Sequence, residues 1–427
     1  MAEVLIDGYN LGMVRGTGIA TYARNLCRDV AHIGHNVGVL YGKSIAEKDD
    51  PLLREIAFFD PKEAAPSKLR KAAGAVSKAI RSPLIQRPLK LEQSGMIETA
   101  SFADRLPRCS AMYNGEDLFN RANIGFALGR GFSRIEMPSP IDLAHWTYPI
   151  PAKVKGAKNI YTLHDLVPLK LPFTTLDNKR QYLKLVKQIA RHADHIVTVS
   201  ECSKNDIMEL LGVGEDRITN TYQTAHIPPQ ALAYDETELA RIIEKGVGVP
   251  FRGYYLFWGS IEPKKNIHRL IEGYLASGVD APLVIVGAQA WKSEEELRLA
   301  SNLGVAEQSK IIQLSYAPRD LLTHLIRGAR AALFPSLYEG FGLPALEAMV
   351  LGTPVISSNT ASLPEVIGDA GLCVNPYVSK EIADAIAQMD GDEAMRRELS
   401  GKGRLQAEQF SSARYQERLV QLYERLI

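Results

Sequence analysis

Short apolar runs alternate with amphipathic stretches through the second half of this 427-residue chain, and this alternation limits the fold more than any other feature. Parallel strands need a crossover connection, usually a helix, so the alternation is typical of parallel α/β sheets. Strands are predicted at residues 254–258, 283–286, 310–314, 331–334 and 354–357. Helices are predicted to begin near residues 266, 294, 318, 344 and 379. We therefore expect a doubly wound sheet in this half.

The first half shows the same alternation less regularly. Its strands are predicted at residues 4–7, 36–41, 142–145, 159–163 and 195–199. Between about residues 44 and 140 the alternation gives way to a Pro- and charge-rich region, in which we do not predict the order of strands and helices. Residues 227–248, which open with two prolines, are predicted to connect two domains. We expect Rossmann-like domains at 1–230 and 231–413, with ligands beyond the carboxyl ends of the strands.

Charge and cysteine content exclude several classes of protein. Lys plus Arg (50) nearly cancels Asp plus Glu (49), so we expect no nucleic-acid partner. The first residues read directly into a strand, and no apolar run approaches the roughly 20 residues that cross a bilayer. The four cysteines lie far apart, so they predict reduced thiols in a cytoplasmic protein, with no disulfide framework and no structural zinc.

One phrase in the second half predicts a phosphate site. After the strand at 331–334, Glu339 precedes a glycine-rich turn, and Pro344 then suits the first turn of a helix. The amides of such a turn lie at the positive end of a helix dipole, where a phosphate binds. Glu347, one turn into the helix, can accept two hydrogen bonds from a ribose diol, and Glu339 can accept from hydroxyls at the other end of the ligand. The turn is Gly340-Phe341-Gly342-Leu343.

The spacing of the two glutamates alone also suits an ordinary helix start. The full motif, Glu-Gly-Phe-Gly-Leu-Pro-x-x-Glu-Ala, is more specific than an ordinary helix start. It resembles the donor-site signature of retaining GT-B glycosyltransferases of family 4, also called glycosyltransferase group 1, and residues 352–356 and 362–366 extend the likeness. The resemblance implies an α/β GT-B fold of two facing Rossmann-like domains, with a last helix at about 414–427 packed back on the first domain. It also implies a nucleotide-sugar donor, transfer to a hydroxyl with retention, and neither metal nor cofactor.

The loop at 259–266 resembles the family's basic loop, in which cations neutralise the nucleotide diphosphate. Lys265 stands at the position of the phosphate lysine. Ser260 replaces an arginine found in many members, so Lys264 is expected to substitute for it. A fixed cation there favours the transition state, because the leaving diphosphate gains negative charge. A solvated helix flank is the alternative for the two lysines, and Asn266 is interpreted as a helix N-cap.

The first half resembles the family more loosely. Gly16, Thr17 and Gly18 stand where the family's glycine-rich loop approaches the donor phosphates. An ordinary tight turn, with the same residue pattern, is the alternative. His164 falls in the His-Asp loop whose histidine points at the transferred sugar, and a core histidine is its alternative. Ser203 with Asp206 resembles a helix capping box and receives no chemical role.

The resemblance implies a mechanism in which Glu339 and His164 orient the sugar and the leaving phosphate accepts the acceptor's proton. Two short sequence motifs, at residues 163–166 and 262–266, look most like those of bacterial polysaccharide mannosyltransferases. We therefore expect GDP-mannose as donor and a glycan or lipid-linked acceptor. Asp390-Gly391-Asp392 lies between predicted helices, so it is interpreted as a turn rather than a metal site.

Rival functions remain open at this point. A GT-B nucleotide-sugar epimerase needs an acid/base pair that is not evident beyond His164. A non-catalytic nucleotide-sugar-binding scaffold stays open as an alternative, because Ser260 replaces the arginine that many family members have in the basic loop. A Rossmann oxidoreductase is disfavoured because Gly16-Thr17-Gly18 is followed by Tyr22 and by no third glycine.

Residues 62–92 are rich in Lys and Arg and are read as a basic amphipathic helix. Such a helix binds an anionic membrane surface, which would place the enzyme peripherally on the inner face of the cell membrane. An ordinary surface helix is the alternative.

Overall fold

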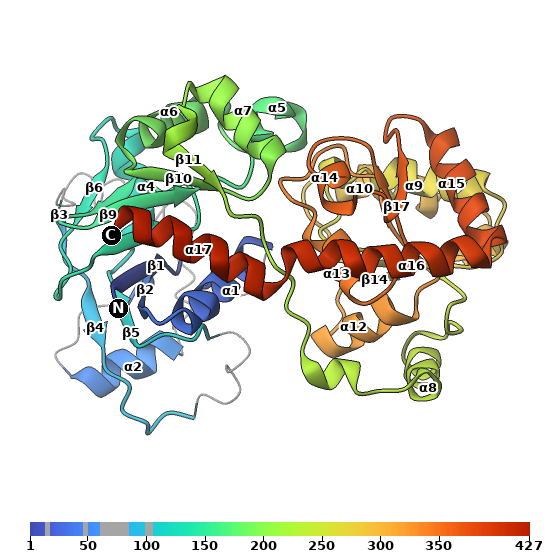
Figure 1. Ribbon diagram of the computed structural model, residues 1–427, viewed down its shortest axis with the longest axis horizontal. Helices are drawn as coiled ribbons and strands as arrows, with labels where there is room; N and C mark the ends of the chain where they lie inside the picture. The colour runs from blue at the N-terminus through green and yellow to red at the C-terminus, as the bar shows by residue number, and fades with distance from the viewer. Residues whose placement is uncertain (13–17, 46–49, 60–84, 99–105) are drawn as a thin grey trace.

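The computed structural model describes residues 1–12, 18–45, 50–59, 85–98 and 106–427, which fold as two α/β domains side by side (Figure 1). The N-terminal domain is built on an eight-stranded sheet in the order β11-β10-β9-β7-β1-β2-β5-β4. All its neighbours pair in parallel except β4 and β5. Its strands are β1 Glu3–Asp7, β2 Asn36–Tyr41, β4 Leu89–Leu91, β5 Ala111–Asn114, β7 Leu143–Trp146, β9 Lys158–Thr162, β10 His195–Thr198 and β11 Ile218–Asn220. A small parallel sheet joins β3 Ile85–Gln86, β6 Ser133–Ile135 and β8 Ala152–Val154.

The C-terminal domain contains a six-stranded parallel sheet in the order β14-β13-β12-β15-β16-β17. The strands are β12 Tyr255–Trp258, β13 Leu283–Val286, β14 Ile311–Leu314, β15 Ala331–Phe334, β16 Val355–Ser358 and β17 Gly371–Val374. Every residue of β12, β13, β15 and β16 is buried. Helices cover both faces of such a sheet, which explains why these strands are continuous apolar runs rather than alternating ones. The predicted fold class is confirmed.

Helices connect successive strands in both domains. In the N-terminal domain they are α1 Gly18–His32, α2 Pro51–Phe59, α4 Leu118–Ala127, α5 Val167–Lys170, α6 Lys179–His192 and α7 Glu201–Leu211. In the C-terminal domain they are α8 Glu236–Val247, α9 Ile267–Ala276, α10 Ser293–Ser301, α11 Val305–Gln308, α12 Arg319–Gly328, α13 Leu343–Val350, α14 Leu363–Ile367, α15 Ser379–Gly391 and α16 Glu393–Ala407.

The chain crosses between the domains a second time through its last helix, α17 Ser412–Leu426, which continues the line of α16 back across the N-terminal domain (Figure 1). The Gln416 amide donates to Asp29 of α1 at 2.7 Å. Tyr423 Oη lies 2.7 Å from the ring nitrogen Nδ1 of the buried His145. Arg425 donates to Thr219 at 2.9 Å. These contacts attach the end of the chain to the N-terminal sheet.

Three predictions change in the structure. Residues 85–86 and 89–91 form strands, not part of a basic helix, and Arg87 pairs with Glu136 at 3.0 Å; residues 62–84 of that segment lie outside the described part of the chain. The predicted connection at 227–248 is shorter, because α8 occupies residues 236–247 and packs on α12. Asp390 and Gly391 are the last two residues of α15, and Asp392 caps α16 by accepting from the amide of Met395 at 2.8 Å, so this motif is a helix junction. Among the described helices, none is long and apolar enough to cross a membrane.

Candidate active site

Two loops meet at the carboxyl edge of the C-terminal sheet, after β12 and after β15. Parallel strands end at the same edge, so residues 259–266 and 335–342 are placed side by side. Gly259 has φ 140°, and its carbonyl oxygen would lie only 1.8 Å from a Cβ at Gly287. Glycine at 287 therefore lets the first loop lie directly against the end of β13.

An ion pair joins the two loops. Lys265 Nζ lies 2.6 Å from Glu339 Oε1, and each side chain is only 12% exposed. Burial by itself raises the pKa of Glu339, but Lys265 and Lys264 outweigh it and lower the pKa below its ordinary value. Burial likewise lowers the pKa of Lys264, but Asp165, Glu262 and Glu339 together raise it above its ordinary value. Glu339 and Lys264 are therefore both charged at neutral pH.

The turn before α13 has the geometry that an anion site needs. Gly342, at the N-cap of α13, has φ 101°, a left-handed conformation that favours glycine. No side chain caps this helix, so the amides of its first turn remain free to bind a ligand. The ring of Phe341 is buried against Phe410 and Tyr222, at centroid distances of 5.5 and 6.3 Å. Phe341 thus contributes its backbone to the turn, and its side chain packs in the core.

Glu347 lies one turn into α13, below these amides. The indole Nε1 of Trp258 donates to Glu347 Oε2 at 3.1 Å. Burial raises the pKa of Glu347, because the indole bond only partly offsets desolvation. One oxygen is thus held by the end of β12 and the carboxylate is positioned beside the turn.

The N-terminal domain reaches this site through the His164–Asp165 loop. A Cβ at Gly340 would lie 2.6 Å from the carbonyl oxygen of His164, so the two loops are in close contact. The Ser203 hydroxyl donates to the carbonyl of His164 at 2.9 Å and lies 3.2 Å from that of Gly340. The structure therefore brings His164 together with the Glu339–Gly340 turn.

His164 itself is held neutral. Its Nε2–H donates to the carbonyl of Thr147 at 3.0 Å. Burial lowers its pKa well below the usual range, although Asp165 acts in the opposite direction. The ring of Tyr22 from α1 packs edge-on against it at 4.7 Å. The imidazole is therefore a neutral group in a fixed orientation, with Nδ1 left as its acceptor.

Comparisons with known proteins agree with this arrangement. The family model described as Glycosyl transferases group 1 matches residues 250–406, and the one described as Glycosyltransferase Family 4 matches residues 110–222. The O-antigen chain mannosyltransferase B of Escherichia coli is 34% identical over 270 residues, which cover 61% of this chain and 68% of that protein. This chain belongs to the group 1 glycosyltransferases.

Other similar proteins differ in how much they share with the chain. The MMP alpha-(1->4)-mannosyltransferase of Mycolicibacterium hassiacum is 28% identical and matches over 96% of this chain and 95% of its own length. The serotype-specific mannosyltransferase WbdA of Escherichia coli is 31% identical over 66% of this chain, which spans only about a third (35%) of WbdA. The structure of Anabaena HepE in complex with UDP-glucose has the same fold, with a TM-score of 0.64 at 14% identity and 100% of both chains covered.

Not every residue predicted for the donor site of this glycosyltransferase reaches the cluster. Gly16 and Thr17 lie outside the described residues, and Gly18 is the first residue of α1, one turn before Tyr22. Ser260 is exposed beside Gly259. Asn266 stands at the N-cap position of α9, but its side chain donates to the carbonyls of Pro335 and Pro376 instead of capping the helix. The N-cap position of Asn266 is therefore confirmed, but its side chain ties two loops together and does not cap the helix.

Asp7 is a site residue that the sequence analysis missed. This buried carboxylate at the end of β1 accepts hydrogen bonds from the amides of Thr147 and Tyr9. Burial raises its pKa to about 6, although these bonds act to lower it. Since the carbonyl of Thr147 also accepts from His164, the backbone of this residue lies between Asp7 and the histidine. The available signal was an acidic residue at the end of the first strand of a Rossmann-like domain.

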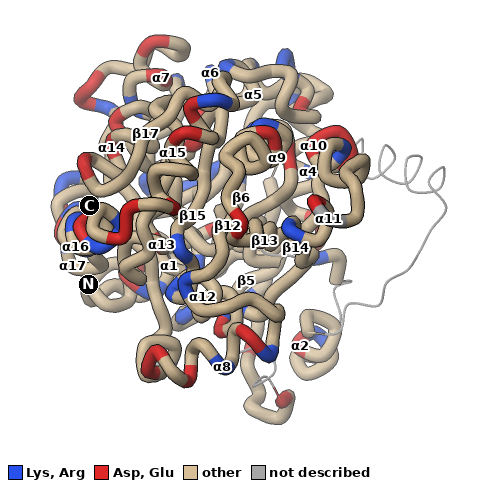
Figure 2. The backbone as a smooth tube through the Cα atoms, turned by 90° about the vertical axis from the view of Figure 1, so that its right-hand side faces the viewer, with Lys and Arg blue, Asp and Glu red and all other residues tan. Residues whose placement is uncertain are grey.

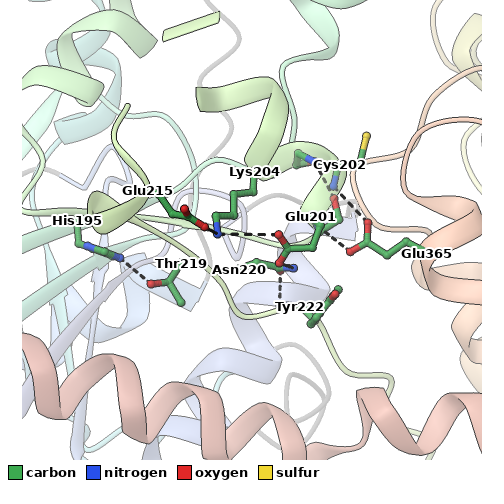
Figure 3. A network of polar contacts seen from close by, with 11 residues as sticks. His195, Glu201, Cys202, Lys204, Glu215, Thr219, Asn220, Tyr222 and Glu365 are labelled. Atoms are coloured by element: carbon green, nitrogen blue, oxygen red, sulfur yellow. Dashed lines mark hydrogen bonds and ion pairs between the residues drawn. The ribbon is translucent and has the colours of Figure 1, made fainter. Parts of the chain in front are cut away.

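A second contact between the domains lies beside the site (Figure 3). Glu365 of α14 accepts hydrogen bonds from the amides of Glu201 and Cys202, at 2.7 and 3.2 Å, at the start of α7. The cap of α7 is Ser200, which accepts from the amide of Ser203. The predicted capping box of Ser203 with Asp206 is therefore wrong, and Asp206 instead accepts from the hydroxyl of Tyr338 across the interface.

Proposed function

We propose that this glycosyltransferase transfers mannose from GDP-mannose to a hydroxyl of a glycan or lipid-linked saccharide in bacterial polysaccharide synthesis, with retention of configuration. The ion pair of Lys265 with Glu339 at the start of α13 is the observation that carries the proposal. The mannosyltransferase names of relatives that align with 61% and 96% of the chain support the sugar.

The geometry suggests how the donor is held. Lys265, Lys264 and the amides at 340–343 would bind the diphosphate, while Glu347 accepts from the ribose diol. Glu339 and Nδ1 of His164 would accept from sugar hydroxyls. Without donor, Lys265 and Glu339 neutralise each other at 2.6 Å. When the donor binds, each exchanges its partner for a ligand group, so neither buried charge is left unpaired in either state.

Transfer would follow from this arrangement. The bond between the anomeric carbon and the diphosphate oxygen breaks as the acceptor oxygen attacks from the same face. The leaving phosphate oxygen takes the acceptor's proton, so no protein nucleophile is needed. The lysines stabilise the charge that develops on the diphosphate, which a divalent metal does in other enzymes. The proposal therefore includes neither metal nor cofactor, and activity should survive excess EDTA.

Donor identity is tested first by thermal shift against nucleoside diphosphates and their sugars, since ligands of the native state raise the melting temperature. GDP and GDP-mannose should give the largest shifts, and a larger shift with another nucleotide would replace the proposed donor. Glu339→Gln should then lower turnover by about 100-fold while the protein stays folded. Glu294→Gln, an exposed change on α10, is the control. Unchanged turnover in Glu339→Gln would remove Glu339 from the chemistry.

We also propose that the enzyme acts in the cytoplasm, peripherally on the inner face of the membrane, where a lipid-linked acceptor would be held. The basic segment at 62–92 is the proposed contact. Co-sedimentation with anionic vesicles that weakens with salt is the expected result, and equal binding to neutral vesicles would exclude the electrostatic contact.

A further inference from the structure

A second cationic site lies on the C-terminal domain, away from the donor site. It is a cavity of about 370 Å³ between α8, α12 and α16. Figure 2 shows the backbone of these three helices on the side of the C-terminal domain that faces the viewer. Six arginines line it: Arg252, Arg327, Arg330, Arg396, Arg397 and Arg404. Pro354 and Arg330, which also line it, directly precede β16 and β15. The cavity therefore opens at the amino edge of the sheet, and strands of four residues, about 13 Å long, separate it from the carboxyl edge.

The arginines are only partly neutralised by acidic side chains. Arg252 pairs with Glu236 at 2.6 Å, Arg397 with Glu393 at 2.5 Å, and Arg330 with Asp390. Within the described residues, Arg327, Arg396 and Arg404 have no carboxylate at ion-pair distance. Counting six arginines against these three carboxylates leaves a local charge of about +3.

Two of the arginines without an ion pair, Arg327 and Arg404, line the same cavity. Burial lowers the pKa of Arg327, and the charge of Arg404 lowers it further. Arg404 lies over Gly352, where an added Cβ would be 2.4 Å from one of its terminal nitrogens. The two like charges therefore disfavour each other, and an anion bound in the cavity would relieve this repulsion.

Structural roles account for only part of this cluster. Arg327 donates to the carbonyls of Ala231 and Tyr234, and Arg396 to those of Met389 and Asp390. These bonds fix the guanidinium groups but leave further N–H donors, since each guanidinium has five. No hydrogen bond of Arg404 to another described residue accompanies its contact with Gly352. The cavity thus presents anchored cations with unused donors.

We propose that this arginine cavity binds a soluble small molecule that carries a phosphate group. Guanidinium groups match phosphate oxygens in bidentate pairs, and a doubly charged phosphate would offset most of the excess charge. The volume is that of an ordinary small-molecule pocket, large enough for a phosphorylated sugar. The end of α13, at Leu351 and Gly352, lines the cavity, so one helix connects it with the donor turn.

Calorimetric titration with inorganic phosphate tests the proposal. Because phosphate also suits the donor site, the titration uses Lys265→Ala, which removes that site's cation. Binding should persist in Lys265→Ala, and adding Arg404→Ser should weaken it about tenfold, since the guanidinium contact is lost. Adding Arg327→Gln as well should abolish it. The control is Arg298→Ser on α10, an exposed arginine outside the cavity.

Three results would overturn the proposal: binding that disappears with Lys265→Ala alone, binding that survives the two arginine changes, or an equal loss in Arg298→Ser. Vesicles of phosphatidylglycerol and phosphatidylcholine in equal parts form the second arm. If wild type binds these vesicles through Arg404 and free phosphate does not compete, a lipid headgroup replaces the soluble ligand. Melting temperatures of all variants show that each is folded.

Discussion

The two domains present different chemistry at the edges where they meet. On the C-terminal side, Lys265 and Glu339 form a charged pair, and the pKa of Glu339 is lowered in spite of its burial. On the N-terminal side, burial raises the pKa of Asp7 to about 6 and lowers that of His164. Glu347, which has an indole N–H but no paired cation, has a raised pKa although it lies in the C-terminal domain. Pairing with a cation, rather than depth of burial, therefore decides which carboxylate is held ionised.

Breaking the charged pair is the strongest test of this contrast. Lys265→Ala should lower the transfer rate by about 100- to 1000-fold, because a charge on the leaving diphosphate loses its partner. It should also destabilise the protein, since Glu339 is left buried and unpaired. Steady-state kinetics and urea unfolding measure the two effects. In Lys265→Ala with Glu339→Gln, stability should recover and rate should not; a recovered rate would make Lys265 purely structural.

Asp7→Asn tests the N-terminal side, where burial favours the neutral form of Asp7. Because the pKa of Asp7 is raised from 3.8 to about 6, its contribution to stability is complete below pH 3.8 and is lost as pH rises through 6. Relative to Asp7→Asn, the wild type should therefore lose about 2.5 kcal/mol between pH 4 and pH 8. Urea unfolding at the two pH values measures the difference. A difference that does not change with pH would contradict a raised pKa.

Gly340→Ala probes the contact between the two edges. The new Cβ would lie 2.6 Å from the carbonyl oxygen of His164, so the domains must separate or the turn must shift, at about 1–3 kcal/mol. Transfer should fall more than nucleotide binding does. Gly401→Ala, on α16 with open space around its Cβ, is the matched control. Equal effects of both changes would show that the interdomain contact is unimportant.

Glu365→Gln should have the smallest effect. The amide oxygen can still accept from Glu201 and Cys202, but the favourable interaction of a carboxylate with the start of α7 is lost, about 0.3–1 kcal/mol. A slightly larger radius of gyration in small-angle scattering is expected, with the difference shrinking in high salt. A compact form identical to wild type at low salt would mean that Glu365 does not hold the domains together.

Prediction from sequence succeeded where short-range rules apply. The strands at 283–286 and 331–334 were predicted residue for residue, because central parallel strands are continuous apolar runs between turns. The region from 44 to 140 was not, since its strands have only two to four residues and one, β4, pairs antiparallel at the sheet edge. The side chains of Asn266 and Ser203 were misread because cap signals are local, whereas the partners of both side chains lie far along the chain.

The sequence by itself determined the class of fold and the elements of the donor turn, because the phrase from Glu339 to Glu347 is placed by one strand, one loop and one helix. Only the tertiary structure decided which charges neutralise each other. Lys265 meets Glu339 across 74 residues, Glu365 meets the start of α7 across 164, and the arginine cavity gathers residues from 252 to 404. Electrostatic interactions depend on distance and burial, and neither is set until the sheets order their strands.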